Sequence, residues 1–90
     1  MQCPQAPRKP VSAQSRLRRF VFTLNNWTPE EYQWLTEVFA PQVKWLIIAK
    51  EVGNNGTPHL QGACIIVSQL SFSTLKTLTG LRRAHIEHVS

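Results

Sequence analysis

The sequence predicts an α+β domain with the ferredoxin-like order strand, helix, strand, strand, helix, strand (βαββαβ). Three observations predict it: a strand-like run over 18–26, a helix start at Thr28, and two apolar runs joined by a turn-rich loop at 53–58. We expect an antiparallel sheet with helices packed on one face, incomplete at the C-terminus. Because many unrelated functions use this architecture, the fold by itself assigns none of them.

Composition limits the chain to one small domain of 90 residues with a formal net charge of +5. Positive charge favours an anionic partner, for example nucleic acid. Two cysteines do not form a disulfide framework, which favours a reducing, intracellular setting. No apolar run is long enough to cross a bilayer and no signal peptide is evident, so we expect no membrane partner.

The first fifteen residues are rich in proline and poor in large apolar side chains, which predicts a disordered tail over 1–15 and a folded domain over 16–90. Half of the Lys and Arg residues precede Phe20, with no acid among them. Such a basic segment is typical of phosphate contacts or nuclear import. A tail that only keeps the protein soluble fits the composition equally well.

The run 18–26 alternates apolar and polar residues as a half-buried strand does. Phe20, Phe22 and Leu24 fall on the predicted core face, and Val21, Thr23 and Asn25 fall on the other. The hydroxyl and amide groups of that second face either meet a ligand or face water.

The next segment has the signature of a helix start. Thr28-Pro-Glu-Glu31 predicts a capping box, with the proline at the first helical position. The residues at helical spacing that we expect to pack on the sheet are Tyr32, Leu35, Val38 and Phe39, and Pro41 is expected to end the helix. Tyr32 is the chain's single tyrosine, and its position indicates packing rather than a nucleophile.

The runs 43–51 and 59–67 read as a β-hairpin. If the register aligns their ends, Glu51, His59 and Gln61 converge near the loop. One imidazole nitrogen with two oxygens suits Mg²⁺ or Mn²⁺ better than structural zinc. On spacing alone, polar residues that merely sit at the mouth of a hairpin are the commoner explanation. Cys64, inside the second run, is expected to be a small core residue.

A second, weaker helix follows, with Ser71 as its cap and Gly80 at its end. Its predicted buried stripe consists of Phe72, Leu75 and Leu78. The segment 84–89 then predicts a last strand. His85 and Glu87 share one face there, either as support for the metal site or, more commonly, as an ordinary polar strand face.

Two motifs carry a resemblance to a known family. Phe22-Thr-Leu-Asn-Asn26 and His59-Leu-Gln-Gly62, with Gly56-Thr-Pro58 before the second, resemble the replication initiators of circoviruses and related small circular single-stranded DNA viruses. The resemblance runs from about Arg18 to the end and includes Ala84-His-Ile-Glu87. It implies an HUH-type endonuclease that has Gln in place of the second His.

The resemblance also implies roles for individual residues. The residues implied in origin DNA binding are Arg18 and Arg19 with the first motif, Phe22, Thr23, Leu24, Asn25 and Asn26. The implied ligands of Mg²⁺ or Mn²⁺ are Glu51, His59 and Gln61. In this family a tyrosine in a Tyr-x-x-Lys motif attacks the scissile phosphate of the viral origin. It joins the 5′ end and leaves a 3′ hydroxyl for rolling-circle replication in the host nucleus.

The chain departs from the family pattern because it contains no Tyr-x-x-Lys motif, and Tyr32 lies in the wrong element. We therefore expect no catalytic residue in this chain, which we interpret as a fragment, a truncated reading frame or a remnant. The leading hypothesis is part of an origin-nicking endonuclease and nucleotidyltransferase. The alternatives are a nucleic-acid-binding module without chemistry and a remnant that associates with intact initiator subunits.

Overall fold

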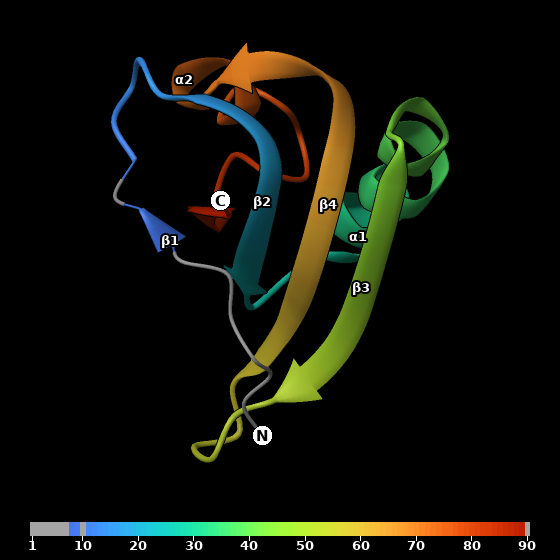
Figure 1. The fold of residues 1–90 in the computed structure, drawn as a ribbon. Helices are drawn as coiled ribbons and strands as arrows, with labels where there is room; N and C mark the ends of the chain where they lie inside the picture. Colours follow the sequence, from blue (N-terminus) through green and yellow to red (C-terminus); the bar gives the residue numbers. More distant parts are fainter. Residues whose placement is uncertain (1–7, 10, 90) are drawn as a thin grey trace.

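The computed structural model describes residues 8–9 and 11–89. These form one antiparallel sheet in the order β1-β5-β2-β4-β3 (Figure 1). The strands are β1 (Arg8–Lys9), β2 (Arg16–Asn25), β3 (Trp45–Val52), β4 (Pro58–Ser71) and β5 (His85–Val89). Without the two-residue β1, the order is that of a ferredoxin-like sheet, so the predicted fold class is confirmed.

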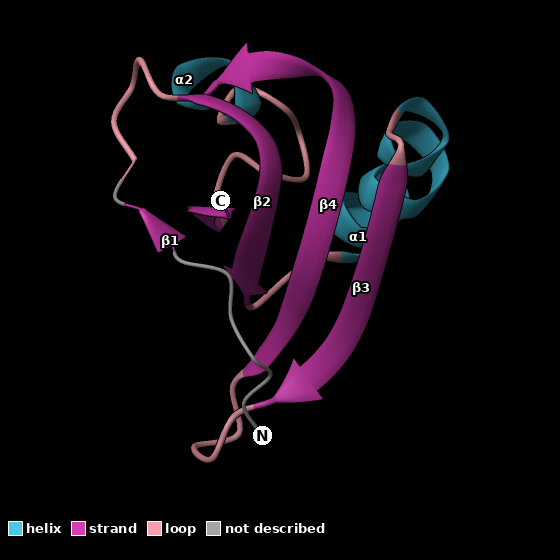
Figure 2. Ribbon diagram, in the orientation of Figure 1, coloured by secondary structure: helices cyan, strands magenta, loops and turns pink. Residues whose placement is uncertain are grey.

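Helices join the strands on one side of the sheet (Figure 2). The first connection is one helical segment in three conformations: α-helix α1 (Pro29–Gln33), π-helix η1 (Trp34–Phe39) and 3₁₀-helix η2 (Ala40–Gln42). The second is the short α2 (Phe72–Leu75). No helix in the described part of the chain is long and apolar enough to cross a membrane.

The capping box predicted at Thr28 is present. The Glu31 backbone N–H donates to Thr28 Oγ1 over 3.2 Å, and the Thr28 backbone N–H donates to Glu31 Oε1 over 2.9 Å. Pro29 occupies the first turn, where it has no intrahelical hydrogen bond to lose. Pro41 does not end the helix as expected, because the chain tightens into η2 and continues to Gln42.

The predicted second helix is shorter than expected. Ser71 caps it, accepting from the Thr74 backbone N–H over 3.2 Å, but α2 stops at Leu75. Beyond it, the Thr77 hydroxyl and backbone N–H both donate to the Thr74 carbonyl, a local bond that competes with helix continuation. Gly80 is therefore not a helix end. It is buried against Trp34 and Leu35 instead.

The core lies between the sheet and the helices. Phe20, Phe22 and Leu24 of β2 are almost completely buried, as predicted, and Cys64 is buried among the apolar side chains. Burial raises the pKa of the Cys64 thiol to about 12, so the thiol stays neutral. From the first helical segment Leu35 and Phe39 join the core, whereas Val38 is 45% exposed, against expectation. Its neighbour Phe39 occupies the inward position and stacks on Trp34.

The expected tail over 1–15 lies partly outside the described residues, at 1–7 and 10. Within the described part, β1 pairs with the edge of β5, with Arg8 opposite Val89. Residues 11–15 lie against the start of α2, where the Phe72 backbone N–H donates to the Ser15 carbonyl over 2.8 Å.

One close contact joins the two central strands. Phe22 of β2 and Gly62 of β4 are paired residues, and the Phe22 ring lies directly over the glycine. A Cβ at Gly62 would stand 2.2 Å from the nearest atom of this ring, which is itself fully buried. The pair therefore requires glycine at this position for lack of space.

We expect Gly62→Ala to lower the free energy of unfolding by about 1–3 kcal/mol or more, because the buried ring has no free space to move into. Urea denaturation followed by circular dichroism measures this. Gly53→Ala is the matched control, since a Cβ there meets its nearest atom at 3.4 Å. Equal stability of the two variants would contradict the packing argument.

Candidate functional site

The sheet face opposite the helices, here called the open face, carries the three predicted metal ligands in adjacent rows. Asn25, His59 and Glu51 are paired across β2, β4 and β3 in one row. Thr23, Gln61 and Ala49 form the next row. Since alternate residues of a strand share a face, Glu51, His59 and Gln61 lie together, and the register assumed from the sequence is the one observed.

Two side chains of this cluster, His59 and Glu51, meet directly. His59 Nε2 lies 3.1 Å from Glu51 Oε1. The His59 side chain is 19% exposed and the Glu51 side chain is 51% exposed. Solvent therefore reaches the pair mainly through the Glu51 carboxylate. Thr23 Oγ1 donates to Gln61 Oε1 over 3.2 Å, which orients the amide oxygen on the same face.

This donor set fits a hard divalent cation. Its groups are an imidazole nitrogen, a carboxylate and an amide oxygen, and the Gln61 oxygen keeps a second lone pair beyond the bond from Thr23. Within the described residues no three His, Cys, Asp or Glu side chains form a cluster. A zinc-type site is therefore not formed there, and an ion held at this place needs Gln61 as its third ligand.

The hairpin loop fixes the register that brings Glu51 and His59 together. The Gly53 backbone N–H donates to the Thr57 carbonyl over 2.9 Å, and Val52 pairs with Pro58 directly before the loop. Gly56 has a φ of +86°, a conformation that glycine adopts without strain. The prediction of an Asn/Gly-rich loop that joins the two strands of a hairpin is thus confirmed.

An ion pair between the buried Glu31 and the half-exposed Arg83, which sequence reasoning missed, holds the end of β2. Arg83 donates to both Glu31 carboxylate oxygens, from Nε over 2.8 Å and from Nη2 over 2.7 Å. Arg83 Nη2 also donates to the Asn26 carbonyl over 3.1 Å. Asn26 has a φ of +51°, and its backbone N–H donates to the Pro58 carbonyl over 2.8 Å.

We call these contacts of Arg83 with Glu31 and Asn26 the Arg83 clamp. They link the start of α1 and the segment before β5 to the end of β2, next to the row that holds His59. From the sequence, Glu31 was assigned only to the capping box, and no function was assigned to Arg83. The two residues are 52 positions apart, so no local spacing could have paired them. The Arg83 guanidinium holds the pKa of the Glu31 carboxyl below its usual value, although burial opposes the shift.

The structure divides the residues predicted to bind DNA. Arg18, Arg19, Asn25 and Asn26 are exposed, and Thr23 is partly exposed on the open face. Phe22 and Leu24 are buried in the core, so their side chains are not available for DNA, and a DNA contact by these two residues would have to come from the backbone. The alternation of β2 turns both side chains inward.

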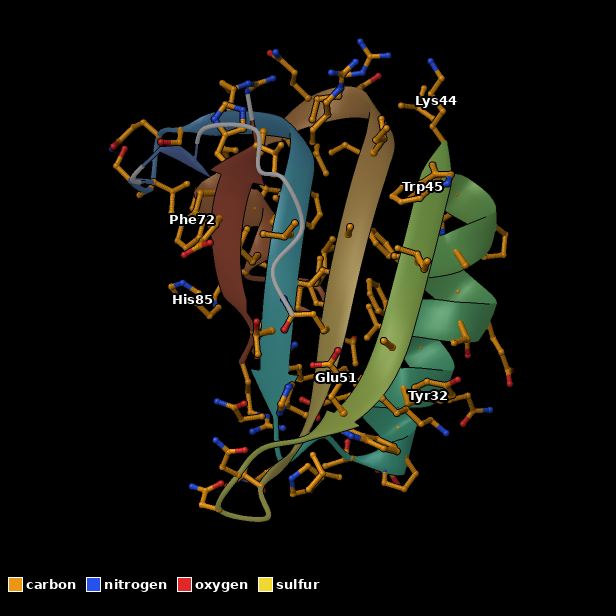
Figure 3. All side chains as sticks on the ribbon, turned by 60° about the horizontal axis from the view of Figure 1, so that its bottom comes forward. Tyr32, Lys44, Trp45, Glu51, Phe72 and His85 are labelled. Atoms are coloured by element: carbon orange, nitrogen blue, oxygen red, sulfur yellow. The ribbon has the colours of Figure 1, made fainter. Side chains whose placement is uncertain are left out.

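Tyr32 packs on the core side of the sheet, in the helical segment behind β3 (Figure 3). Its ring packs on Trp27, with centroids 5.5 Å apart, and Lys50 Nζ lies 4.3 Å from its centroid. Lys50 precedes Glu51 and therefore points to the opposite face. The predicted packing role of Tyr32 agrees with this position.

His85 lies on the open face beside Thr23, but its ring is turned along its own strand. His85 Nε2 lies 3.3 Å from Glu87 Oε2, and the two strands pair Thr23 with His85. This second His–Glu pair occupies the neighbouring row and is not part of the Glu51–His59 contact.

Fold, register and the two motifs together define the class of this chain, a viral replication protein domain. Residues 17–90 match the family described as "Putative viral replication protein", and the chain belongs to that family. The resemblance to circovirus initiators that the two motifs indicated is confirmed.

Curated relatives support this membership. The chain is 39% identical over 83 residues to the replication-associated protein of pigeon circovirus, covering 92% of this chain and 25% of the relative. It is 38% identical over 78 residues to that of beak and feather disease virus, covering 87% of this chain and 26% of the relative. It is 41% identical over 78 residues to the replication-associated protein of canary circovirus, covering 87% of this chain and 26% of the relative. The chain thus spans about a quarter of the length of these relatives.

The Arg83 clamp gives a prediction for pH. Because the folded-state pKa of Glu31 is lowered, its contribution to stability is present above the ordinary value of 4.5 and is lost as pH falls below it. We expect Arg83→Gln to be less stable than wild type near neutral pH and to lose less stability on acidification. Urea denaturation at several pH values measures both effects.

Arg82→Gln is the control, since the neighbouring arginine is exposed and the change in charge is the same. If both variants show the wild-type pH dependence, the Glu31 carboxylate does not depend on Arg83.

Proposed function

We propose that this chain is the metal-binding part of a rolling-circle replication initiator, an HUH-type endonuclease and nucleotidyltransferase that nicks and joins single-stranded DNA at a viral origin. The observation that carries the proposal is the convergence of Glu51, His59 and Gln61 on the open face. Membership in the viral replication protein family supports it.

In this proposal His59, Gln61 and Glu51 hold Mg²⁺ or Mn²⁺, which when bound polarises the scissile phosphate and stabilises developing negative charge. Thr23 orients the Gln61 amide, and such supporting hydrogen bonds strengthen metal sites in proteins. The Arg83 clamp holds Asn25 and Asn26 beside the cluster. Arg18 and Arg19 attract the DNA backbone.

The partner is single-stranded DNA of the origin, and the site of action is the host nucleus, in line with the net charge of +5. The proposal also includes binding of this chain to intact initiator subunits. Binding without chemistry is the second candidate, and the exposure of Arg18 and Arg19 favours it independently of the metal cluster.

Metal binding tests the proposal directly. In a Mn²⁺ titration by calorimetry we expect saturable binding to the wild-type chain and a loss of affinity of at least about ten-fold in His59→Ala, since a ligand is removed. His85→Ala is the matched control, because that histidine also faces a glutamate on the open face. Wild-type binding in His59→Ala, or loss of binding in His85→Ala alone, would contradict the assignment.

The chemistry gives a second prediction. The chain's single tyrosine, Tyr32, is packed on the core side, so these 90 residues supply no tyrosine to attack a phosphate at the cluster. With Mn²⁺ and a circovirus origin oligonucleotide, we expect no covalent protein–DNA adduct on a denaturing gel. An adduct that disappears in Tyr32→Phe would show that this tyrosine reaches DNA.

A further inference from the structure

The open face carries a second feature, a pocket at the end opposite Glu51, His59 and Gln61. These three residues are called the metal cluster here because of the role proposed for them. It has a volume of about 410 Å³ and is lined by Arg18, Arg19, Lys44, Trp45 and Ile65. Lys44 and Trp45 lie at the start of β3 and Glu51 near its other end (Figure 3). We call this feature the Trp45 pocket.

The strand register builds the pocket. Arg19, Ile65 and Trp45 are paired across β2, β4 and β3, so Ile65 forms the floor between the arginine and the indole. The Lys44 backbone N–H donates to the Ile65 carbonyl over 2.9 Å, which fixes the lysine at the rim. Trp45 is 50% exposed, an unusual amount for a side chain that normally buries a large apolar area.

The charge of the pocket is uncompensated within the described part of the chain. No carboxylate there forms an ion pair with Arg18, Arg19 or Lys44. Three cations around an exposed aromatic ring match a phosphate chain that carries flat bases. A protein segment seated here would need several acids to balance the same charge, so the charges favour nucleic acid.

The position relative to the metal cluster also fits an extended strand of DNA. His59 and Ile65 are six residues apart on β4, which corresponds to roughly 20 Å. Between the row of Gln61 and the row of Ile65 lies one further row, which consists of Val21, Ala63 and Ile47. These small or apolar side chains form a surface on which bases can lie.

We propose that the Trp45 pocket is a nucleotide-binding subsite for single-stranded DNA. One base stacks on the Trp45 indole, and the flanking phosphates are neutralised by Arg18, Arg19 and Lys44. The proposal builds on the proposed function and adds a contact several nucleotides away from the phosphate at the metal cluster. The subsite needs no metal, because none of its five lining residues belongs to the cluster.

Fluorescence anisotropy of a labelled oligothymidylate, titrated in EDTA at several salt concentrations, tests the subsite. Trp45→Ala should bind at least about five-fold more weakly, the effect expected for one lost stacking contact, with an unchanged salt dependence. Trp45→Phe should retain most of the affinity. Arg19→Gln should lower the slope of log affinity against log salt by about 0.7.

Lys50→Gln is the control for Arg19→Gln, since it removes one positive charge from the opposite face. Circular dichroism of each variant checks folding. The proposal is overturned if folded Trp45→Ala binds DNA as wild type does, or if Trp45→Phe loses as much affinity as Trp45→Ala. It is also overturned if Trp45→Ala changes only self-association in sedimentation, which would identify the pocket as a contact between copies.

The same titrations separate this proposal from the proposed function. Loss of Mn²⁺ binding in His59→Ala tests the cluster alone, and stacking measured in EDTA tests the pocket alone. A wild-type chain that binds no Mn²⁺ but shows the Trp45 effect would refute the first and retain the second.

Discussion

The contact of the Phe22 ring with Gly62 is the constraint on which the rest of the structure depends. It brings β2 and β4 together at the centre of the sheet and allows no side chain beneath the ring. Because the two residues are a register pair, the contact sets which residues of both strands point inward. The two sequence motifs that contain Phe22 and Gly62 therefore occur together for a physical reason. The Phe22 ring fits only because Gly62 has no side chain.

Alternation then turns the functional groups outward. With Phe22 and Gly62 facing the helices, their neighbours Thr23 and Gln61 face the open side and hydrogen-bond to each other. Two residue pairs further along, in the next row of the same face, Asn25 and His59 extend this polar region to the loop end, where Glu51 meets the imidazole. Packing and chemistry are thus separated by face. The core uses one side of each strand, and the other side remains available for ligands.

Two sets of charges act at different places. The Arg83 clamp is an ion pair in which Glu31 is largely buried and accepts two hydrogen bonds from Arg83, and it fixes the backbone beside the Glu51–His59 contact. At the far end of the open face, Arg18, Arg19 and Lys44 have no such acid in the described part of the chain. Glu31 thus neutralises Arg83, whereas Arg18, Arg19 and Lys44 give the far end of the open face a positive surface suited to phosphate.

The sequence by itself determined the order of the elements, the capping box, the core face of β2 and the turn that brings Glu51 to His59. These depend on short-range rules of spacing, alternation and turn chemistry. It misplaced the end of the first helix, because the chain continues past Pro41 as a 3₁₀ turn to Gln42. It also misjudged the length of the second, where the Thr77 hydroxyl bonds locally to the Thr74 carbonyl. Only the tertiary structure decided the Arg83–Glu31 pair, the tight fit at Gly62 and the Trp45 pocket. Each joins residues distant in sequence, and their approach depends on how the strands register and how the helices pack.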